Sequence, residues 1–282
     1  MKKLPDVEHY KISDISKMLG ISVSGLKLYE KRGILRPVRK QENGYRRYNF
    51  MDIACIVMNR FFMSFGFSMN ESIGLYNAHE PGDIVGELEK QEKRLKEEIL
   101  RQEQVLEFLR NYKSEMTHAG DEIGKCIINR HPALYLLKYH DEGTIALNHE
   151  EQEEFSRWIN HMPFVRITST YPLENFRARK PHITVYLSIT EEWAKRTGFD
   201  PGPMSIYLPA RRSVTTMAYE SSETFTYDCL NHVYDFVAQN GLVLAGDPFC
   251  FCDLMLSNHE RSGYLLNRYR RTWVPIEEET ET

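Results

Sequence analysis

The chain has 282 residues, enough for two domains that each bury a core, and a formal net charge of −4. The charge is unevenly distributed. Residues 1–60 carry 13 lysines and arginines against 6 acidic residues, a net charge of +7, which leaves −11 for the remaining residues. This asymmetry favours a basic N-terminal domain joined to an acidic C-terminal part. No run of about 18 apolar residues and no signal-peptide pattern occurs, and five scattered cysteines exclude a disulfide framework, so we expect a cytoplasmic protein without a membrane span.

The first predicted elements, in residues 10–35, form a helix-turn-helix. Three apolar residues at helical spacing give the first helix an inner face, namely Ile12, Ile15 and Leu19. Gly20 suits the left-handed exit of that helix, and Ser22 or Ser24 can cap the next one. Leu26 is the expected inward anchor of the second helix. This order of elements is typical of proteins that place one helix in the major groove of DNA.

A basic hairpin is predicted after the second helix. Asn43 and Gly44 form a strong turn signal, because both residues tolerate positive φ. Four cations flank this turn, namely Arg39, Lys40, Arg46 and Arg47. A hairpin with this charge favours contact with phosphates. As an alternative, a three-helix core needs no DNA, and Tyr45 and Tyr48 can simply pack the hairpin.

This segment resembles the MerR family of bacterial transcription regulators, which carry a winged helix-turn-helix. The matching residues are Leu28-Tyr29-Glu30, Gly33-Ile34-Leu35, Pro37, Arg39, Gly44-Tyr45-Arg46 and Tyr48. Where the family usually carries Arg-Tyr-Tyr, this chain has Lys27-Leu28-Tyr29, which keeps the charge but loses the forked donor of arginine. The resemblance implies that Ser24 approaches bases and that six residues hold phosphates, namely Lys27, Tyr29, Arg39, Tyr45, Arg46 and Tyr48.

Three helices are predicted after the hairpin. Residues 50–65 predict one rich in Met and Phe, which we interpret as core residues, and Ser68 with Glu71 predicts a capping box for a second. Residues 83–116 predict one long helix with a heptad seam of Leu88, Leu95, Ile99, Leu106 and Leu109. A monomer could fold this stripe back on its own body. The resemblance instead implies an antiparallel coiled coil between the subunits of a homodimer.

The second half predicts short strands and two helices after a linker at Met116 to Asp121. Strands are expected at 132–140, 164–171, 182–189, 213–219, from 242 onward and at 264–276, and helices at 150–162 and 223–240. The order of strand, helix and strands, occurring twice, predicts a pseudo-repeat α+β domain.

Two short motifs connect this half to a known domain. The helix exit at residues 240–242 and the closing run at residues 272–276 resemble a GyrI-like effector-binding domain, which with the head resembles the multidrug-sensing, BmrR-like branch of the MerR family. The predicted fold class is therefore α+β. We assign residues 1–80 to the winged helix-turn-helix DNA-binding domain, 81–118 to the coiled-coil dimerisation helix and linker, and 119–282 to the effector-binding domain.

Aromatic residues of the second half are candidates for a ligand pocket, since flat rings stack on varied small molecules. The candidate ligand residues are Tyr135, Tyr139, Phe164, Tyr186, Tyr207, Tyr219, Tyr269, Arg271 and Trp273. The alternative is that strand aromatics simply fill the core.

Arg271 indicates the charge of the ligand. Aligning residues 274–276 with the closing motif of the resembled multidrug sensors places Arg271 where they commonly carry a glutamate for cationic drugs. An uncharged or anionic aromatic ligand is therefore expected, with Tyr269, Arg271 and Trp273 on one strand face. Alternatively Arg271 pairs with a local acid, and acids such as Glu174, Glu220 or Asp253 could still serve a cation.

Metal and enzyme chemistry are weakly supported. Cys250-Phe251-Cys252 with His259 nearby offers too few ligands at zinc spacing, and residues 79–116, where the metal-sensing members carry cysteines, contain none. No phosphate-cradling glycine loop, nucleophile elbow or His-Glu-x-x-His motif occurs. We therefore expect no metal, no cofactor and no enzymatic activity. A hydrolase stays the enzymatic alternative, because proteins with the fold of the second domain alone can hydrolyse small molecules.

The resemblance implies a ligand-responsive transcription activator. Such a dimer binds promoter DNA and distorts an over-long spacer so that RNA polymerase engages both promoter elements. A small aromatic or lipophilic molecule would be the effector sensed by the C-terminal domain. The alternative is a DNA-binding repressor or architectural protein whose C-terminal domain binds a protein partner.

Overall fold

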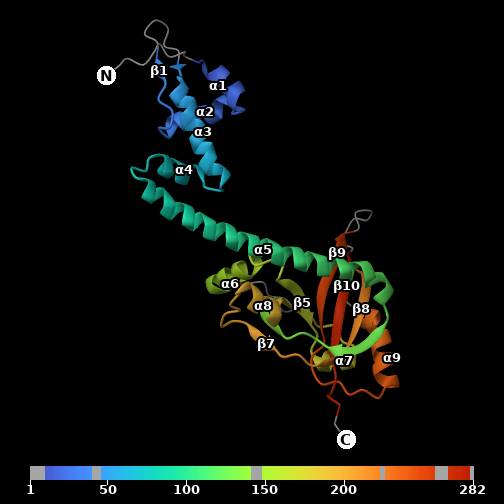
Figure 1. Ribbon diagram of the computed structural model, residues 1–282. Helices are drawn as coiled ribbons and strands as arrows, with labels where there is room; N and C mark the ends of the chain where they lie inside the picture. The colour runs from blue at the N-terminus through green and yellow to red at the C-terminus, as the bar shows by residue number, and fades with distance from the viewer. Residues whose placement is uncertain (1–9, 40–45, 141–147, 223–225, 258–265, 280–282) are drawn as a thin grey trace. The chain divides into compact units, whose positions relative to one another are not determined.

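The computed structural model describes residues 10–39, 46–140, 148–222, 226–257 and 266–279. They belong to two compact units, residues 1–100 and 101–282, which we describe one at a time (Figure 1). The predicted hairpin tip, with Asn43, Gly44 and Tyr45, lies outside the described residues. The long helix α5, Pro81–Glu122, supplies residues to both units.

The first unit contains the predicted helix-turn-helix. Its elements before α5 are α1 Ile12–Leu19, α2 Val23–Lys31, β1 Val38–Arg39, β2 Arg46–Arg47, α3 Phe50–Ser64 and α4 Met69–Tyr76. Gly20 ends α1 with a φ of 63°, and Ser22, not Ser24, caps α2 by accepting the Gly25 N–H at 3.1 Å. Ile15 and Leu26 are fully buried between the two helices, so the predicted core of this motif is confirmed.

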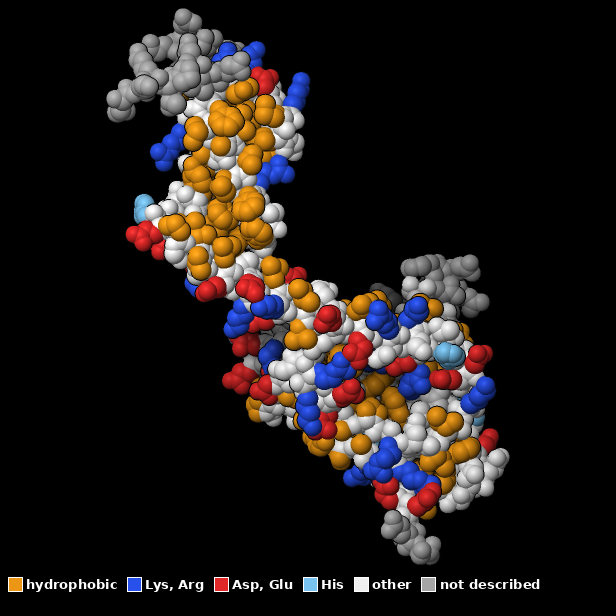
Figure 2. Space-filling model, viewed as in Figure 1, with side chains coloured by type: hydrophobic (Ala, Val, Ile, Leu, Met, Phe, Trp, Pro, Cys, Tyr) orange, Lys and Arg blue, Asp and Glu red, His pale blue; other side chains and the backbone are white. Residues whose placement is uncertain are grey.

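The apolar side chains of α3 lie on two opposite sides of the helix. Ile53 and Ile56 pack into the core of the unit, as their spacing requires. In contrast, many Met and Phe side chains are exposed, namely Phe50, Met51, Met58, Phe61 and Phe65. Our interpretation of these residues as core was wrong, because only one face of α3 packs against neighbouring helices. Figure 2 shows apolar side chains gathered over this unit.

Helix α5 is longer than predicted. It continues through residues 116–121, so the predicted linker there is wrong. A single glycine inside a helix costs only about 1 kcal/mol, which a helix of 42 residues tolerates. The five seam residues are 37–58% exposed in this single chain, which leaves the stripe free to pack on another helix.

The described residues of the second unit form an eight-stranded antiparallel sheet of order β3-β8-β10-β9-β5-β6-β4-β7. The strands are β3 Cys126–Arg130, β4 Leu134–His140, β5 Arg166–Thr170, β6 Thr184–Thr190, β7 Ile206–Leu208, β8 Arg212–Ser222, β9 Phe249–Ser257 and β10 Leu266–Pro275. The helices are α6 His149–Ile159, α7 Leu173–Ala178, α8 Glu191–Thr197 and α9 Asn231–Gln239, with a 3₁₀ turn η1 at Tyr227–Leu230. The mixed helix and sheet architecture agrees with the predicted class.

Several elements of this unit differ from the sequence prediction. Strands β3 and β7 and helices α7 and α8 were missed, because they are short and carry little periodic pattern. The strand expected from residue 242 starts only at Phe249, and the helix expected from residue 223 starts at Asn231 after η1. Gly241 follows α9 with a φ of 59°, as predicted for a helix exit.

The two faces of β9 and β10 carry different cores. Cys250 and Val274 belong to a cluster with residues of α7 and α9. Their alternate neighbours Phe249, Phe251 and Trp273 form a second cluster, in which Trp273 stacks on Phe249 at 5.1 Å between ring centroids. The second face is the one that α5 reaches, since Arg271 of β10 pairs with Glu122 of α5. Side-chain alternation along the strands thus places one aromatic layer next to α5.

Candidate DNA-binding surface and ligand cavity

The outer side of α2 carries polar and cationic side chains. Ser24 and Lys27 are exposed, as are Lys31 and Arg32 at the end of the helix. The Ser24 hydroxyl lies 2.9 Å from the capping hydroxyl of Ser22, so it sits at the first turn of α2. A helix start and a cationic flank are therefore available to a nucleic acid on one side of the unit.

Glu30 connects α2 to the base of the hairpin. Arg46 of β2 places its Nε atom 3.1 Å from Glu30, and the Tyr48 hydroxyl donates a hydrogen bond to the same carboxylate. Glu30 is 14% exposed, whereas Arg46 is 42% exposed and keeps part of its fork free for another anion. Burial, together with the Glu30 contact, raises the pKa of the Tyr48 hydroxyl well above its ordinary value. This arrangement holds the Arg46 guanidinium at the base of the hairpin, beside the end of α2.

Two of the predicted DNA contacts lie in the core. Tyr48 is fully buried, and Tyr29 is 5% exposed with its hydroxyl 3.9 Å from the Met63 sulfur. Burial raises the pKa of Tyr29. Both rings therefore pack the unit, and their contact with phosphates stays a prediction. Arg39 pairs with Arg46 across the β1–β2 ladder, while Tyr45 lies outside the described residues.

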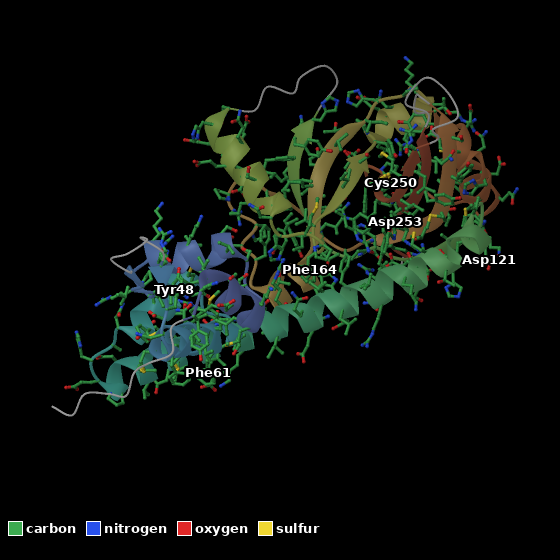
Figure 3. All side chains as sticks on the ribbon, turned by 90° about the horizontal axis from the view of Figure 1, so that it is seen from above. Tyr48, Phe61, Asp121, Phe164, Cys250 and Asp253 are labelled. Carbon is green, nitrogen blue, oxygen red and sulfur yellow. The ribbon has the colours of Figure 1, made fainter. Side chains whose placement is uncertain are left out.

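The second unit contains a cavity of about 170 Å³, which we name the arginine cavity. It is lined by Phe108, Glu115, Pro132, Phe164, Arg166, Ser188, Thr190, Trp193, Phe251, Arg271 and Trp273. The structure thus brings together three candidate ligand residues from distant parts of the sequence, namely Phe164, Arg271 and Trp273. Figure 3 labels Phe164 and Asp253, both of which lie beside α5.

The six remaining candidates lie elsewhere in the unit. Four of them form ring pairs, Tyr135 with Tyr207 at 5.1 Å and Tyr219 with Tyr269 at 5.0 Å between centroids. Tyr139 packs on Phe155, and Tyr186 packs against the cluster of Phe249. None of the six lines the arginine cavity.

The pairing of β9 with β10 contains a bulge. Tyr269 pairs with Leu254 and Arg270 with Cys252, so Asp253 is an extra residue in β9. The pairing of β10 with β8 is regular from Leu266 to Pro275, so Tyr269, Arg271 and Trp273 alternate onto one face of β10, as predicted. Only Arg271 and Trp273 of the three line the arginine cavity, because Tyr269 lies two residues farther along the strand and packs on Tyr219.

A network of charges lies along one edge of the arginine cavity. Arg166 of β5 contacts both Asp253 and Glu115 at 3.3 Å. Arg271 contacts Glu122 at 3.1 Å, and its Nε atom lies 3.6 Å from the Asp253 carboxylate without a hydrogen bond. The Asp253 side chain is fully buried. The alternative that Arg271 pairs with a local acid is thus the geometry observed, with Asp253 and Glu122 as the acids.

The sequence did not indicate most of the residues that line this cavity, among them Phe108, Glu115 and Arg166. Phe108 and Glu115 fell inside the helix predicted to pair with a second subunit, and Arg166 carried no recognisable motif. Helix α5 has apolar residues on more than one side. Phe108 packs on Phe164 of the second unit at 5.6 Å between ring centroids, whereas the seam residue Leu109 is exposed. Apolar residues of α5 outside the heptad positions, such as Phe108, were the one sequence signal that could have indicated a second packing face on this helix.

A wider apolar cavity of about 460 Å³ adjoins the first and shares Phe108 and Arg166 with it. Its lining consists of Val105, Phe108, Leu109, Tyr112, Met162, Pro163, Val165, Arg166, Ile167, Cys252 and Asp253. The hydroxyl of Tyr112 donates to the Asp253 carbonyl at 2.6 Å, which ties α5 to β9 between the two spaces. The arginine cavity therefore adjoins further apolar surface.

Titration of Asp253 is expected to change the stability of this unit with pH. Burial raises the pKa of the Asp253 carboxyl from 3.8 to about 6, against the opposing effect of Arg166. Between these values the folded state binds more protons than the unfolded state, so stability falls as the pH rises. Relative to wild type, Asp253→Asn should gain about 2 to 3 kcal/mol between pH 4 and pH 7.5.

This expectation can be measured by urea unfolding with tryptophan fluorescence, because all three tryptophans of the chain belong to the second unit. Asp121→Asn is the matched control, since it makes the same chemical change at an exposed position of α5. A difference between wild type and Asp253→Asn that stays constant from pH 4 to 7.5 would contradict the assignment.

The cysteines offer little for metal chemistry. Among the described residues, no group of three His, Cys, Asp or Glu side chains could hold a metal ion. Cys250 is buried, and burial raises the pKa of the Cys252 thiol to about 11, which keeps it protonated near neutral pH. In the same described part of the chain, no helix combines the length and apolar character needed to cross a membrane.

Comparison with known proteins matches the first unit to a family. Residues 10–77 match the family model described as MerR HTH family regulatory protein. The HTH-type transcriptional regulator CueR of Escherichia coli O157:H7 is 28% identical over 120 residues, which cover 42% of this chain and 89% of that protein. The family match and this relative give residues 10–77 a MerR-type helix-turn-helix.

Solved structures resemble the chain more distantly. The EcmrR–DNA complex is 16% identical with a TM-score of 0.32, and the match covers 96% of this chain and 100% of that chain. A hydrolase from Listeria innocua is 12% identical with a TM-score of 0.35, covering 59% of this chain and 98% of that chain. At such low similarity, neither structure assigns a function to the second unit.

Proposed function

Because residues 10–77 carry a MerR-type helix-turn-helix, we propose that the chain is a transcription regulator that binds promoter DNA as a homodimer and responds to a small molecule. The observation that carries this proposal is the cationic side of α2, with Lys27 exposed and Arg46 held beside it by Glu30. The relative CueR is itself named a transcriptional regulator. A cytoplasmic location follows from this role.

Dimerisation is proposed through α5. Five apolar residues at heptad spacing are exposed on one helix, and in water such a stripe is stabilised by packing on a second helix. A two-fold dimer carries two copies of α2, which suits a near-palindromic DNA site. Activation by distortion of the promoter spacer for RNA polymerase is part of the same proposal.

The second unit is proposed to bind the effector, a small aromatic or lipophilic molecule. The arginine cavity and the adjoining apolar cavity provide aromatic walls for such a ligand. Phe108 of α5 lines both cavities, so a ligand bound in either one would contact the proposed dimerisation helix directly. We propose no enzymatic step for this unit.

The proposal is tested by selecting duplexes from a random DNA library with the purified full chain. Enrichment of one near-palindromic sequence, bound with an affinity that falls steeply with salt, is expected. If no sequence is enriched, or if binding is independent of salt, the proposed function is wrong.

Arg46→Ala is expected to weaken binding to selected and unrelated duplexes alike. The salt slope of binding should fall by about 1 per subunit, because one phosphate contact is lost from each. Arg46→Lys should keep the slope, since it keeps the charge. Lys90→Gln is the control, because Lys90 pairs with Glu87 on α5. An unchanged slope in Arg46→Ala removes Arg46 from the phosphate contacts.

A further inference from the structure

We propose that the arginine cavity binds a small aromatic carboxylate, which competes with two carboxylates of α5 for the same arginines. This inference rests on the proposed function, since it names the class of effector and the way in which its binding reaches α5. It concerns Arg166 and Arg271 on the sheet and Glu115 and Glu122 on the helix.

Two guanidinium groups reach the cavity from different strands. Arg166 comes from β5 and Arg271 from β10, and their side chains are 18% and 19% exposed. A guanidinium presents forked donors that match a carboxylate, and partial burial strengthens such a contact relative to water. A cationic ligand in the same space would meet both arginines at close range.

Aromatic rings around the arginines favour a flat ligand. The guanidinium carbon of Arg166 lies 5.0 Å from the ring centroid of Phe108 and 5.3 Å from that of Phe251. Phe164 lies 4.9 Å from Trp193 between centroids, and Phe108 packs on both of these rings. A volume of about 170 Å³ limits the ligand to a small ring system. These walls bind ring faces while the arginines bind the acid.

The two arginines are already occupied by α5. Glu115 and Glu122 are seven residues apart and therefore lie on one face of the helix. Glu115 contacts Arg166 at 3.3 Å, and Glu122 contacts Arg271 at 3.1 Å. Their side chains are 34% and 43% exposed, so each can turn into water with a small loss of free energy.

Displacement of Glu115 and Glu122 would leave one uncompensated positive charge at the two arginines. Asp253 is fully buried between Arg166 and Arg271 and stays in place. When Glu115 and Glu122 turn outward, two arginines face one aspartate, and a single carboxylate restores neutrality. With Asp253 holding its position, Glu115 and Glu122 act as internal competitors of the ligand.

Ligand binding is thereby coupled to α5. The contacts of Glu115 and Glu122 tie residues 115–122 to β5 and β10. A ligand that replaces them binds best to the state in which this part of α5 is loosened, which is the differential affinity that a switch requires. The attachment of the C-terminal end of α5 to the sheet therefore depends on whether the effector is bound.

The test uses three naphthalene derivatives of matched size and different charge, titrated into the full chain by calorimetry. The probes are 2-naphthoate, 2-naphthalenemethanol and 2-naphthylmethylammonium. We expect 2-naphthoate to bind at least ~10-fold more tightly than the alcohol, because it alone brings a negative charge to the guanidinium groups. Tightest binding of the ammonium compound would overturn the proposal.

Variants test whether Glu122 competes with the ligand or only makes a structural contact. Arg271→Gln should weaken 2-naphthoate by ~10-fold or more and leave the alcohol unchanged. Glu122→Gln should act in the opposite direction and tighten 2-naphthoate ~3- to 10-fold, since it removes a competitor. Glu103→Gln, at an exposed position of α5, is the control and should change neither. Weaker or unchanged 2-naphthoate binding in Glu122→Gln refutes the competition.

Hydrogen exchange provides the second readout. In the complex with 2-naphthoate, amides of residues 115–122 should exchange faster than in the free chain, whereas slower exchange would refute the displacement. If the chain selects a duplex but 2-naphthoate binds neither wild type nor Glu115→Gln/Glu122→Gln, only this inference fails. If 2-naphthoate binds as described but no duplex is selected, the proposed function fails instead.

Discussion

Glutamate at both Ile99 and Leu106 is expected to convert the proposed dimer to a monomer. The two residues are 58% and 45% exposed in the single chain, so the substitution leaves the fold of the monomer intact. In a coiled coil, however, both side chains would be buried, and four carboxylates would enter one interface. At about 1 kcal/mol or more for each, the dissociation constant should rise at least ~1000-fold.

Sedimentation velocity at micromolar concentration measures this change, and circular dichroism checks that the helix content is kept. Binding to the full selected duplex should fall to the affinity of a single head, because the second copy of α2 is no longer held in place. Lys93→Glu is the matched control, since it adds a glutamate to an exposed position of α5 outside the seam. A double variant that remains dimeric shows that the stripe of α5 is not the interface.

Loss of Glu220 is expected to destabilise the second unit by about 3 to 5 kcal/mol. This glutamate is 6% exposed, accepts hydrogen bonds from Arg270 and from the Thr226 N–H at 3.0 Å, and pairs with Arg268 at 3.2 Å. Glu220→Ala takes the carboxylate away from arginines that stay inside the unit. The cost comes from the buried charge that is left behind, more than from the contact that is lost.

Urea unfolding with tryptophan fluorescence reports this effect in the full chain. A second change, Arg270→Met in the Glu220→Ala background, should recover part of the stability, since it removes one of the charges. Glu278→Ala is the control: Glu278 pairs with Arg130 at 2.9 Å at the surface, where screening by water leaves little measurable effect. Equal effects of the two glutamate changes would argue against a buried charge network at Glu220.

Short-range sequence patterns were sufficient to predict the helices of the first unit. Ile15 and Leu26 at helical spacing, Gly20 at a helix exit and the capping box of Ser68 with Glu71 all act over a few residues, so each can be read without knowing the fold. The heptad of α5 is likewise a pattern along one helix. The same patterns misassigned Phe61 as core, because they show that a residue is apolar but not whether a neighbour covers it.

The sequence by itself therefore determined the helix-turn-helix, the long helix and most strands of the sheet. Only the tertiary structure decided the arginine cavity, because the charges around it come from Glu115, Arg166, Asp253 and Arg271, which lie on four separate elements. Strand order brings β5, β9 and β10 together, and one extra residue in β9, Asp253, shifts the pairing of β9 with β10. Pairing register and the face that α5 covers depend on contacts between distant residues, and no local pattern records them.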